Sequence, residues 1–327
     1  MFLKEIFFER MNFMIRKMMR SLCLMVTAIF MVELVAVSGA MAATPETMQD
    51  KLVAVEKAAY GEAQTGALLD RVSRLEKDFT KSQPNESVMK RVDDIYEKMF
   101  MNDLGPSLIT QMNAIEYGLT QEVSMKSIQE RVNDMEMTLA GKTSEGPYIK
   151  RIETLAGYAF GSSTMPLEAV TIPANTLVKV STVTPINAKN LKKGDQIEYQ
   201  AAEDAIENGL LLFAKGAPGY GTVQKVTQAR NFGRDAEVEI DFESLRAIDG
   251  TDASMLLGEE SKKKMESMAM AAGASLAGML VLGPIGVIGG AFIHGKNIDL
   301  PAGTELYIQT SEDVTLYGLR VESGAAE

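Results

Sequence analysis

Residue types that usually carry chemistry are scarce in this sequence. Its 327 residues include one cysteine, one histidine and no tryptophan. Because Cys23 lies in the N-terminal leader, the sequence after it offers no disulfide and no thiolate metal ligand. His294 flanks an apolar segment without an evident partner for a nucleophilic relay, and no phosphate-binding glycine loop or calcium-loop spacing is present. We therefore predict no enzymatic activity, no catalytic residues, no metal site and no cofactor.

Basic residues are also in deficit. The net charge is −11 and the isoelectric point is near 4.9. A nucleic-acid-binding domain needs a basic face, so this balance argues against nucleic acid as a partner. The acidity suits a solvated, exported protein, although acidity alone identifies no partner.

The first 42 residues have the order of a secretory signal peptide. Basic residues precede an apolar core at residues 22–37, and small residues follow it up to Ala42. We predict cleavage after Ala42 and export to the periplasm or the outer membrane. The alternative is an uncleaved anchor helix, and Glu33 weakens the apolar run that such a helix would need.

A 20-residue repeat runs through residues 51–161. A first copy is visible at residues 51–55, which gives six units, and a fixed period of this kind indicates a repeat architecture. Three phases of the repeat hold, in turn, a polar position, an apolar position and a second apolar position three residues further on: Arg71, Arg91, Gln111, Arg131 and Arg151; Val72, Val92, Met112, Val132 and Ile152; and Leu75, Ile95, Ile115, Met135 and Leu155.

Each unit is predicted to be one short helix followed by a turn. Within residues 66–79 the apolar positions recur at spacings of three and four, as on one face of a helix. Glycine and proline separate successive stripes and suit helix ends. One continuous helix is excluded because 20 residues would rotate the stripe by about 200° per repeat, and the pattern of a leucine-rich repeat is missing. Residues 43–161 should therefore form a domain of stacked helices.

Charged residues recur in the same register. Glu56, Glu76, Glu116 and Glu136 each lie five residues after the arginine phase, so the two charges do not face each other on one helix. The simpler interpretation is that both are solvated on outer faces. The alternative is that they pair between neighbouring repeats. The fourth copy departs from the pattern, with Gln111 for arginine and Gly118 inside the stripe, which leaves room for a kink.

The second half of the chain predicts a β-domain. Residues 162–171 are interpreted as a linker, and residues 172–327 alternate short β-branched runs with glycine and proline turns. The predicted class is α+β, with the helical array followed by a small antiparallel β-barrel or sandwich. Two similar Pro-Ala turns, at 172–176 and 300–304, are interpreted as structural turns that start strands. The predicted strands cover residues 176–184, 196–202, 210–213, 221–226, 236–242 and 305–310.

An apolar segment interrupts this β-domain. Residues 267–293 carry no formal charge, and Gly283-Pro284 divides them into an alanine-rich helix and a glycine-rich arm. We predict a glycine- and alanine-rich helical hairpin inserted at residues 262–294. Small residues let helices approach closely, so three roles stay open: contact with membrane lipid, self-association into a homo-oligomer, or burial in the protein's own interface. The predicted contact residues are Gly273, Gly278, Gly283, Gly286 and Gly290.

Two features resemble known families. The repeated segments Arg71-Val72-Ser73-Arg74-Leu75-Glu76 and Arg131-Val132-Asn133-Asp134-Met135-Glu136 resemble tandem repeats in exported proteins of diderm bacteria. Residues 172–207, with Lys193-Gly194-Asp195 and the later Lys215-Gly216-Ala217, look like a β-domain common in uncharacterised bacterial envelope proteins. That stretch is also loosely similar to the β-domain of conjugation-channel scaffold proteins. These motifs are structural, so the resemblance implies a compartment more than an activity.

The sequence thus predicts an exported, non-enzymatic protein of the cell envelope. Its role would be structural or docking, with an envelope protein or membrane lipid as partner. The alternative is an envelope hydrolase built from scattered carboxylates, which would need a cleft between the repeats and the β-domain.

Overall fold

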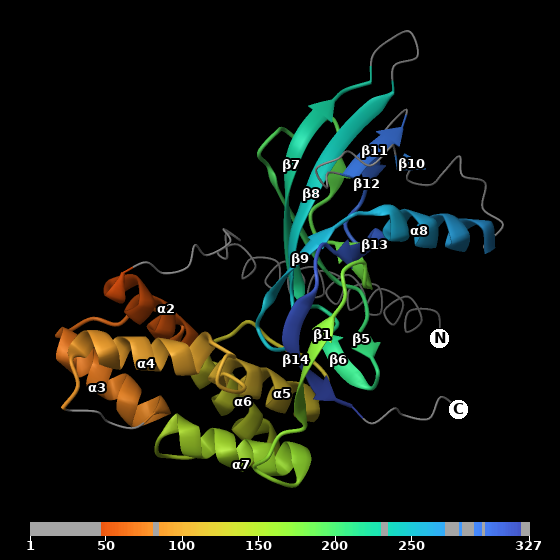
Figure 1. The fold of residues 1–327 in the computed structure, drawn as a ribbon. Helices are drawn as coiled ribbons and strands as arrows, with labels where there is room; N and C mark the ends of the chain where they lie inside the picture. Colours follow the sequence, from red (N-terminus) through yellow and green to blue (C-terminus); the bar gives the residue numbers. More distant parts are fainter. Residues whose placement is uncertain are drawn as a thin grey trace, which may run out of the picture. The chain divides into compact units, whose positions relative to one another are not determined.

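The protein is an α+β molecule in which six short helices precede an antiparallel β-barrel (Figure 1). The computed structural model describes residues 47–80, 85–229, 235–271, 281–282, 291–295 and 298–321. The predicted signal peptide and its anchor alternative lie outside these residues. Among the helices that are described, none is long and apolar enough to span a bilayer.

The six helices begin at intervals of 20 residues, as the repeat predicts. Serine or threonine caps most of them; the Ser107 hydroxyl, for example, accepts a hydrogen bond from the Thr110 N–H at 3.2 Å. The fourth helix continues through Gly118 to Thr120 without a break. The helices are α2 (Met48–Tyr60), α3 (Leu68–Phe79), α4 (Val88–Phe100), α5 (Leu108–Thr120), α6 (Ile128–Ala140) and α7 (Tyr148–Phe160).

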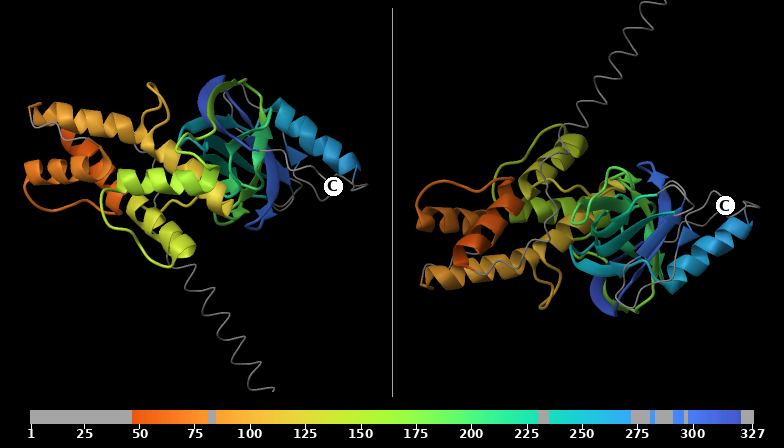
Figure 2. Two further views of the ribbon diagram at one scale, coloured as in Figure 1. Left: turned by 90° about the horizontal axis from the view of Figure 1, so that it is seen from below. Right: turned by 90° about the horizontal axis from the view of Figure 1, so that it is seen from above.

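The apolar stripes of the six helices meet in one continuous core. Val72, Val92 and Ile115 are each at most 1% exposed, and equivalent residues of the other copies join them. Helix α2 packs against α4 and α6, and α3 packs against α7, so distant copies touch as well as neighbouring ones. Figure 2 shows the helices as one group from two further sides. The predicted burial of each stripe by its neighbours is confirmed.

The barrel has six antiparallel strands. Each strand pairs with the next in the order β8, β7, β4, β2, β13, β9, and β9 pairs again with β8 to close the ring. All six strands predicted from the sequence are present, one of them in the smaller sheet below. The barrel strands are β2 (Leu177–Thr182), β4 (Gln196–Ala201), β7 (Pro218–Thr227), β8 (Ala236–Arg246), β9 (Asp252–Leu256) and β13 (Glu305–Thr310).

A second, four-stranded sheet has the order β1, β14, β6, β5. Strand β1 occupies the second half of the range 162–171 that was expected to be a linker, so the β-domain starts earlier than predicted. The reason is a non-local pairing, in which Leu167 lies opposite Leu319 on β14. The sequence around Leu167 does not indicate that partner. These strands are β1 (Leu167–Ile172), β5 (Ala205–Glu207), β6 (Leu210–Phe213) and β14 (Val314–Arg320), and the short pair β3 (Ile186–Asn187) and β12 (Asp299–Leu300) stands apart.

The described part of the predicted helical hairpin is helical only as far as Ala271, in helix α8 (Glu259–Ala271). The end of the first arm, before Gly283, is strand β10 (Val281–Leu282), and the described part of the second arm contains strand β11 (Ala291–Gly295), so these parts of the prediction are wrong. Strand β11 pairs with the end of β8 that extends beyond β9, where Ile293 lies opposite Val238 and is 3% exposed. The pairing of β11 with the free edge of β8 therefore outweighs the tendency of small residues to form a packed helix.

Each of the two Pro-Ala turns leads into a strand, as predicted. Asn175 and Gly303 occupy the left-handed position, with φ of 71° and 84°. In each turn the following threonine hydroxyl donates to the proline carbonyl, at 2.8 Å for Thr176 and 2.7 Å for Thr304. Strands β2 and β13 then pair with each other, so the two turns start adjacent strands of the barrel.

Candidate functional site

Buried ion pairs connect successive helices of the array. The arginine of one helix reaches the glutamate of the preceding helix, fifteen residues earlier: Arg91 donates to both carboxylate oxygens of Glu76 at 2.8 Å. The Glu76 and Arg91 side chains are 1% and 7% exposed. Equivalent pairs join Arg71 to Glu56, Arg131 to Glu116 and Arg151 to Glu136.

These pairs correct the expectation that the recurrent charges are solvated on outer faces. The alternative, pairing between neighbouring repeats, is the arrangement formed. Because a fifteen-residue separation spans one helix end and one turn, the two side chains meet across the helix junction. The turn itself is fixed by the same carboxylate, since the Ser144 N–H donates to Glu136 at 2.7 Å and the Ser124 N–H donates to Glu116 at 2.9 Å.

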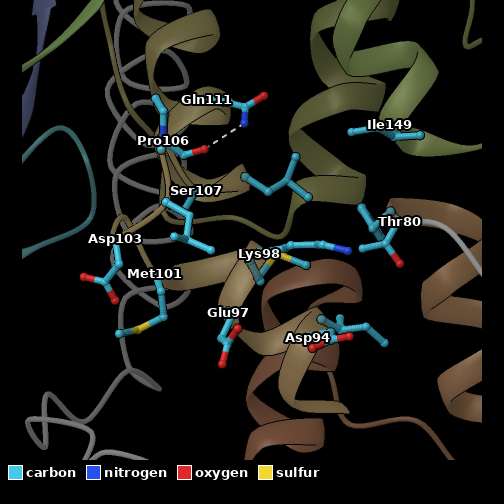
Figure 3. A pocket seen from close by; sticks show the side chains of 16 residues that line it. Thr80, Asp94, Glu97, Lys98, Met101, Asp103, Pro106, Ser107, Gln111 and Ile149 are labelled. Carbon is cyan, nitrogen blue, oxygen red and sulfur yellow. Dashed lines mark hydrogen bonds between the residues drawn. The ribbon is translucent and has the colours of Figure 1, made fainter. Parts of the chain in front are cut away.

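One junction lacks its ion pair. Between α4 and α5 the glutamate position holds Tyr96 and the arginine position holds Gln111, so both charges are absent together. The Gln111 side-chain amide donates instead to the Pro106 carbonyl at 2.9 Å (Figure 3). The repeat therefore changes where α4 passes into α5.

An open groove of about 1160 Å³ lies at this junction (Figure 3). Its apolar lining includes Phe79, Ile95, Met99 and Leu108, each at most 6% exposed. The loop 101–107 forms one side of the groove. Its residue Leu104 is fully exposed, so a large apolar side chain stands at the groove edge without cover from the described residues.

The polar lining of the groove is predominantly acidic. Asp94 and Glu97 come from α4 and Asp103 from the loop, and Lys98 is the one basic residue among the described lining side chains. Lys90 holds Asp94 through both carboxylate oxygens at 3.0 Å. Three carboxylates around an apolar lining favour a partner that brings both apolar surface and positive charge.

Hydrogen bonds to the β-domain fix the loop that borders the groove. The Asn102 side-chain amide donates to the carboxylate of Asp249 at 3.2 Å, and its oxygen accepts the Ser107 N–H at 2.8 Å. The Thr110 hydroxyl donates to the Asp249 carbonyl at 2.8 Å. Asp249 is therefore the centre of the contact between the helical array and the β-domain.

Asp249 also begins a turn of the β-domain. Its carboxylate accepts the Thr251 N–H at 2.9 Å, and Gly250 follows at φ 82°. The same carboxylate accepts the Tyr317 N–H at 2.9 Å, which ties the turn to β14. Burial raises the pKa of Asp249 above its ordinary value, although these backbone donors oppose the shift.

Helix α5 supplies the rest of the contact. Ala114 and Tyr117 form an apolar cluster with Leu211, Ile248 and Leu319 of the β-domain. The Asn113 amide donates to the Ile248 carbonyl at 2.8 Å, and the Tyr117 hydroxyl donates to Asp204 at 2.6 Å. The Asn113 oxygen accepts from Arg131 at 2.9 Å, so the ion-pair series of the helices connects directly to the β-domain.

The sequence carried a signal for this contact that pattern reading missed. The outer face of α5 lacks the charges that other copies place at the same phase. Thr110 is one example, because the equivalent residues are all charged: Asp50, Asp70, Lys90, Glu130 and Lys150. An uncharged outer face on one repeat of an acidic array indicates a covered surface.

The residues predicted from the sequence to contact membrane or another copy, Gly273, Gly278, Gly283, Gly286 and Gly290, lie outside the described residues. The backbone of His294 belongs to β11, opposite Glu237 of β8. Within the described part of the chain, no cluster of three or more His, Cys, Asp or Glu is arranged to hold a metal ion.

Comparison with known proteins adds little to this geometry. No protein-family model and no curated protein matches the chain. Among solved structures it is similar to ComB10 of the Com type IV secretion system of Helicobacter pylori, with 14% sequence identity and a TM-score of 0.25 over 44% of this chain and 89% of ComB10. At this TM-score the likeness carries no argument about function. The resemblance to exported repeat proteins stays a prediction.

Proposed function

We propose that this protein is a non-enzymatic component of the bacterial cell envelope with a docking role. The observation that carries the proposal is the open groove between α4 and α5, which is apolar inside and acidic at its edge. Two further features support it. The β-domain fixes the loop beside the groove through Asp249, and the N-terminal sequence has the order of an export signal.

A groove of this kind suits recognition rather than support alone. Fixed loops on a rigid scaffold commonly carry binding residues, and exposed apolar surface with a polar edge marks interaction sites. The glycine-rich segment is proposed to serve membrane contact or self-association, as a second attachment within the envelope.

Photo-cross-linking in intact cells tests the docking role. A photoreactive amino acid is placed at Leu104, at the groove edge, and separately at Leu69, Leu139 and Tyr158, which are 54%, 46% and 65% exposed on α3, α6 and α7. We expect defined adducts with envelope components from at least one of these surfaces. Absence of adducts from all four positions would contradict a docking role.

An envelope hydrolase is the second candidate, because the groove gathers three carboxylates. Glycoside hydrolysis needs one carboxyl group as acid and a second as base or nucleophile. The test is the release of reducing ends from purified cell-wall glycan. Activity that is lost in Glu97→Gln and Asp103→Asn would establish this candidate, whereas no release by the wild-type protein leaves the docking proposal in place.

A further inference from the structure

The groove lies at the one junction of the described helical array that lacks the ion pair. At four helix junctions an arginine and a glutamate fill the space between helices, with side chains at most 12% exposed. At the α4–α5 junction Gln111 lines the groove and turns its amide to Pro106, so no such pair crosses the space. Among the described lining residues of this groove there is thus no arginine or glutamate of the two recurrent phases.

The charges around the groove constrain the occupant. Asp94 and Glu97 lie one turn apart on α4, and Asp103 lies on the loop that joins α4 to α5. An anionic ligand would be repelled by this lining, and a purely apolar ligand would cover carboxylates without compensating them.

We infer that the groove binds a short segment of a partner protein that carries an apolar side chain flanked by lysine or arginine. The apolar side chain enters between Phe79, Met99 and Leu108, and it is covered on one side by the exposed Leu104. The flanking cations pair with the carboxylates of Glu97 on α4 and Asp103 on the loop, while Asp94 keeps its pairing with Lys90. This inference rests on the docking role proposed above and names the chemistry of the partner.

A displayed library of random twelve-residue peptides tests the inference with the full mature chain as bait. Peptides are selected on the wild-type protein and, in parallel, on Leu104→Asp, in which a carboxylate replaces the apolar residue at the groove edge. Leu139→Asp is the matched control, because Leu139 is an exposed leucine on α6 at 46%. We expect the wild-type protein and the control to enrich peptides with an apolar residue next to lysine or arginine, and Leu104→Asp to enrich none of them.

Fluorescence polarisation of one enriched peptide then measures the contribution of charge. The double substitution Glu97→Lys and Asp103→Lys should weaken its binding by about tenfold or more, because like charges then face each other across the groove. Circular dichroism confirms that the variant keeps its helices, since both residues are exposed.

Several outcomes would overturn the inference. Enriched peptides without lysine or arginine, no enrichment over Leu104→Asp, or unchanged binding to the double variant would each do so. A wild-type dimer in sedimentation that becomes monomeric in Leu104→Asp would make a second copy the occupant and also reject it. If the peptides fail while cross-links form from Leu69, Leu139 or Tyr158, the docking role stands and only the groove assignment falls.

Discussion

At the scale of residues, the arginine and glutamate phases behave as one unit. Both members are present at four junctions and both are replaced at the fifth, by Tyr96 and Gln111. At the array end the same rule holds: Ala156 stands at the glutamate phase of the last helix, where no seventh helix follows to supply an arginine. A buried charge is costly without its partner, so the two positions change together.

Removing one member of an ion pair should therefore lower the free energy of unfolding more than removing both members together. We expect Glu76→Gln to lower the free energy of unfolding by roughly 3–5 kcal/mol, because Arg91 would stay buried without its carboxylate. The double variant Glu76→Gln and Arg91→Gln should lose less than the sum of the two single losses, with a coupling of about 1–3 kcal/mol. Urea unfolding measures these values. Lys126→Gln, in an exposed pair, is the control, and strictly additive losses would contradict the coupling.

The Glu136 pair predicts a pH dependence. Burial by itself raises the pKa of Glu136, but hydrogen bonds from Arg151 and from the Ser144 N–H outweigh it, so the pKa lies below the ordinary 4.5. Ionised Glu136 thus contributes stability above pH 4.5, and this stability is lost as the pH falls through the lowered pKa. Glu136→Gln should flatten that loss in unfolding titrations below pH 4.5. Parallel curves for the variant and the wild-type protein would show that Glu136 is not the cause.

At the scale of elements, helix α5 differs from the other repeat helices because its outer face lacks their charged residues. Ala114 is fully buried against the β-domain, while the equivalent residue of α6, Asp134, is exposed. Gly118 serves close packing, because a Cβ there would lie 3.0 Å from the Phe160 ring of α7. One repeat has thus become the interface between the array and the β-domain.

Restoring the ordinary repeat residue should disrupt that interface. Ala114→Asp places an unpaired carboxylate among Leu211, Ile248 and Leu319, and we expect a loss of roughly 3 kcal/mol. Hydrogen exchange should increase in the turn 246–251 at the same time. The control is the reverse substitution at the equivalent position of α6, Asp134→Ala. It should change the free energy of unfolding by no more than about 0.5 kcal/mol. Equal effects of the two changes would mean that the α5 face is not a contact.

Substitution of two glycines by alanine should change the stability in opposite directions. A Cβ at Gly219 would enter the ring of Tyr199, its cross-strand partner on β4, so Gly219→Ala should destabilise the barrel by about 1–3 kcal/mol. Gly157 lies on α7, and a Cβ there would have no neighbouring atom within 4 Å. Gly157→Ala should therefore stabilise the protein by about 0.5–1 kcal/mol. Melting temperatures measure both changes, and a stable Gly219→Ala protein would contradict the close packing of β4 on β7.

How much of these elements the sequence predicts follows from the range of the interactions. The helices repeat a local stripe every 20 residues, so their number, length and buried faces were predictable. Strands β1 and β14 pair across almost 150 residues with weak alternation, and neither was predicted. The groove was not predicted either, because its described lining combines residues of α3, α4, α5, α7 and the loop 101–107, which are far apart in sequence.

At the scale of the whole molecule, three parts of the description fit one another. Residues 48–160 form an array of helices joined by buried ion pairs, and α5 and Asp249 fix that array to the β-domain. A groove lies beside the fixed loop, at the junction without an ion pair. The proposed docking role requires that this groove meets its partner in the cell envelope.

Cell fractionation tests that requirement most directly. The chain is expressed with a C-terminal tag, and cytoplasmic, periplasmic and membrane fractions are compared, with carbonate and detergent washes of the membranes. Mass spectrometry determines where the mature chain begins. We expect a protein that starts at Ala43 and lies in the periplasm or with the outer membrane. An unprocessed chain in the cytoplasmic fraction would contradict the account.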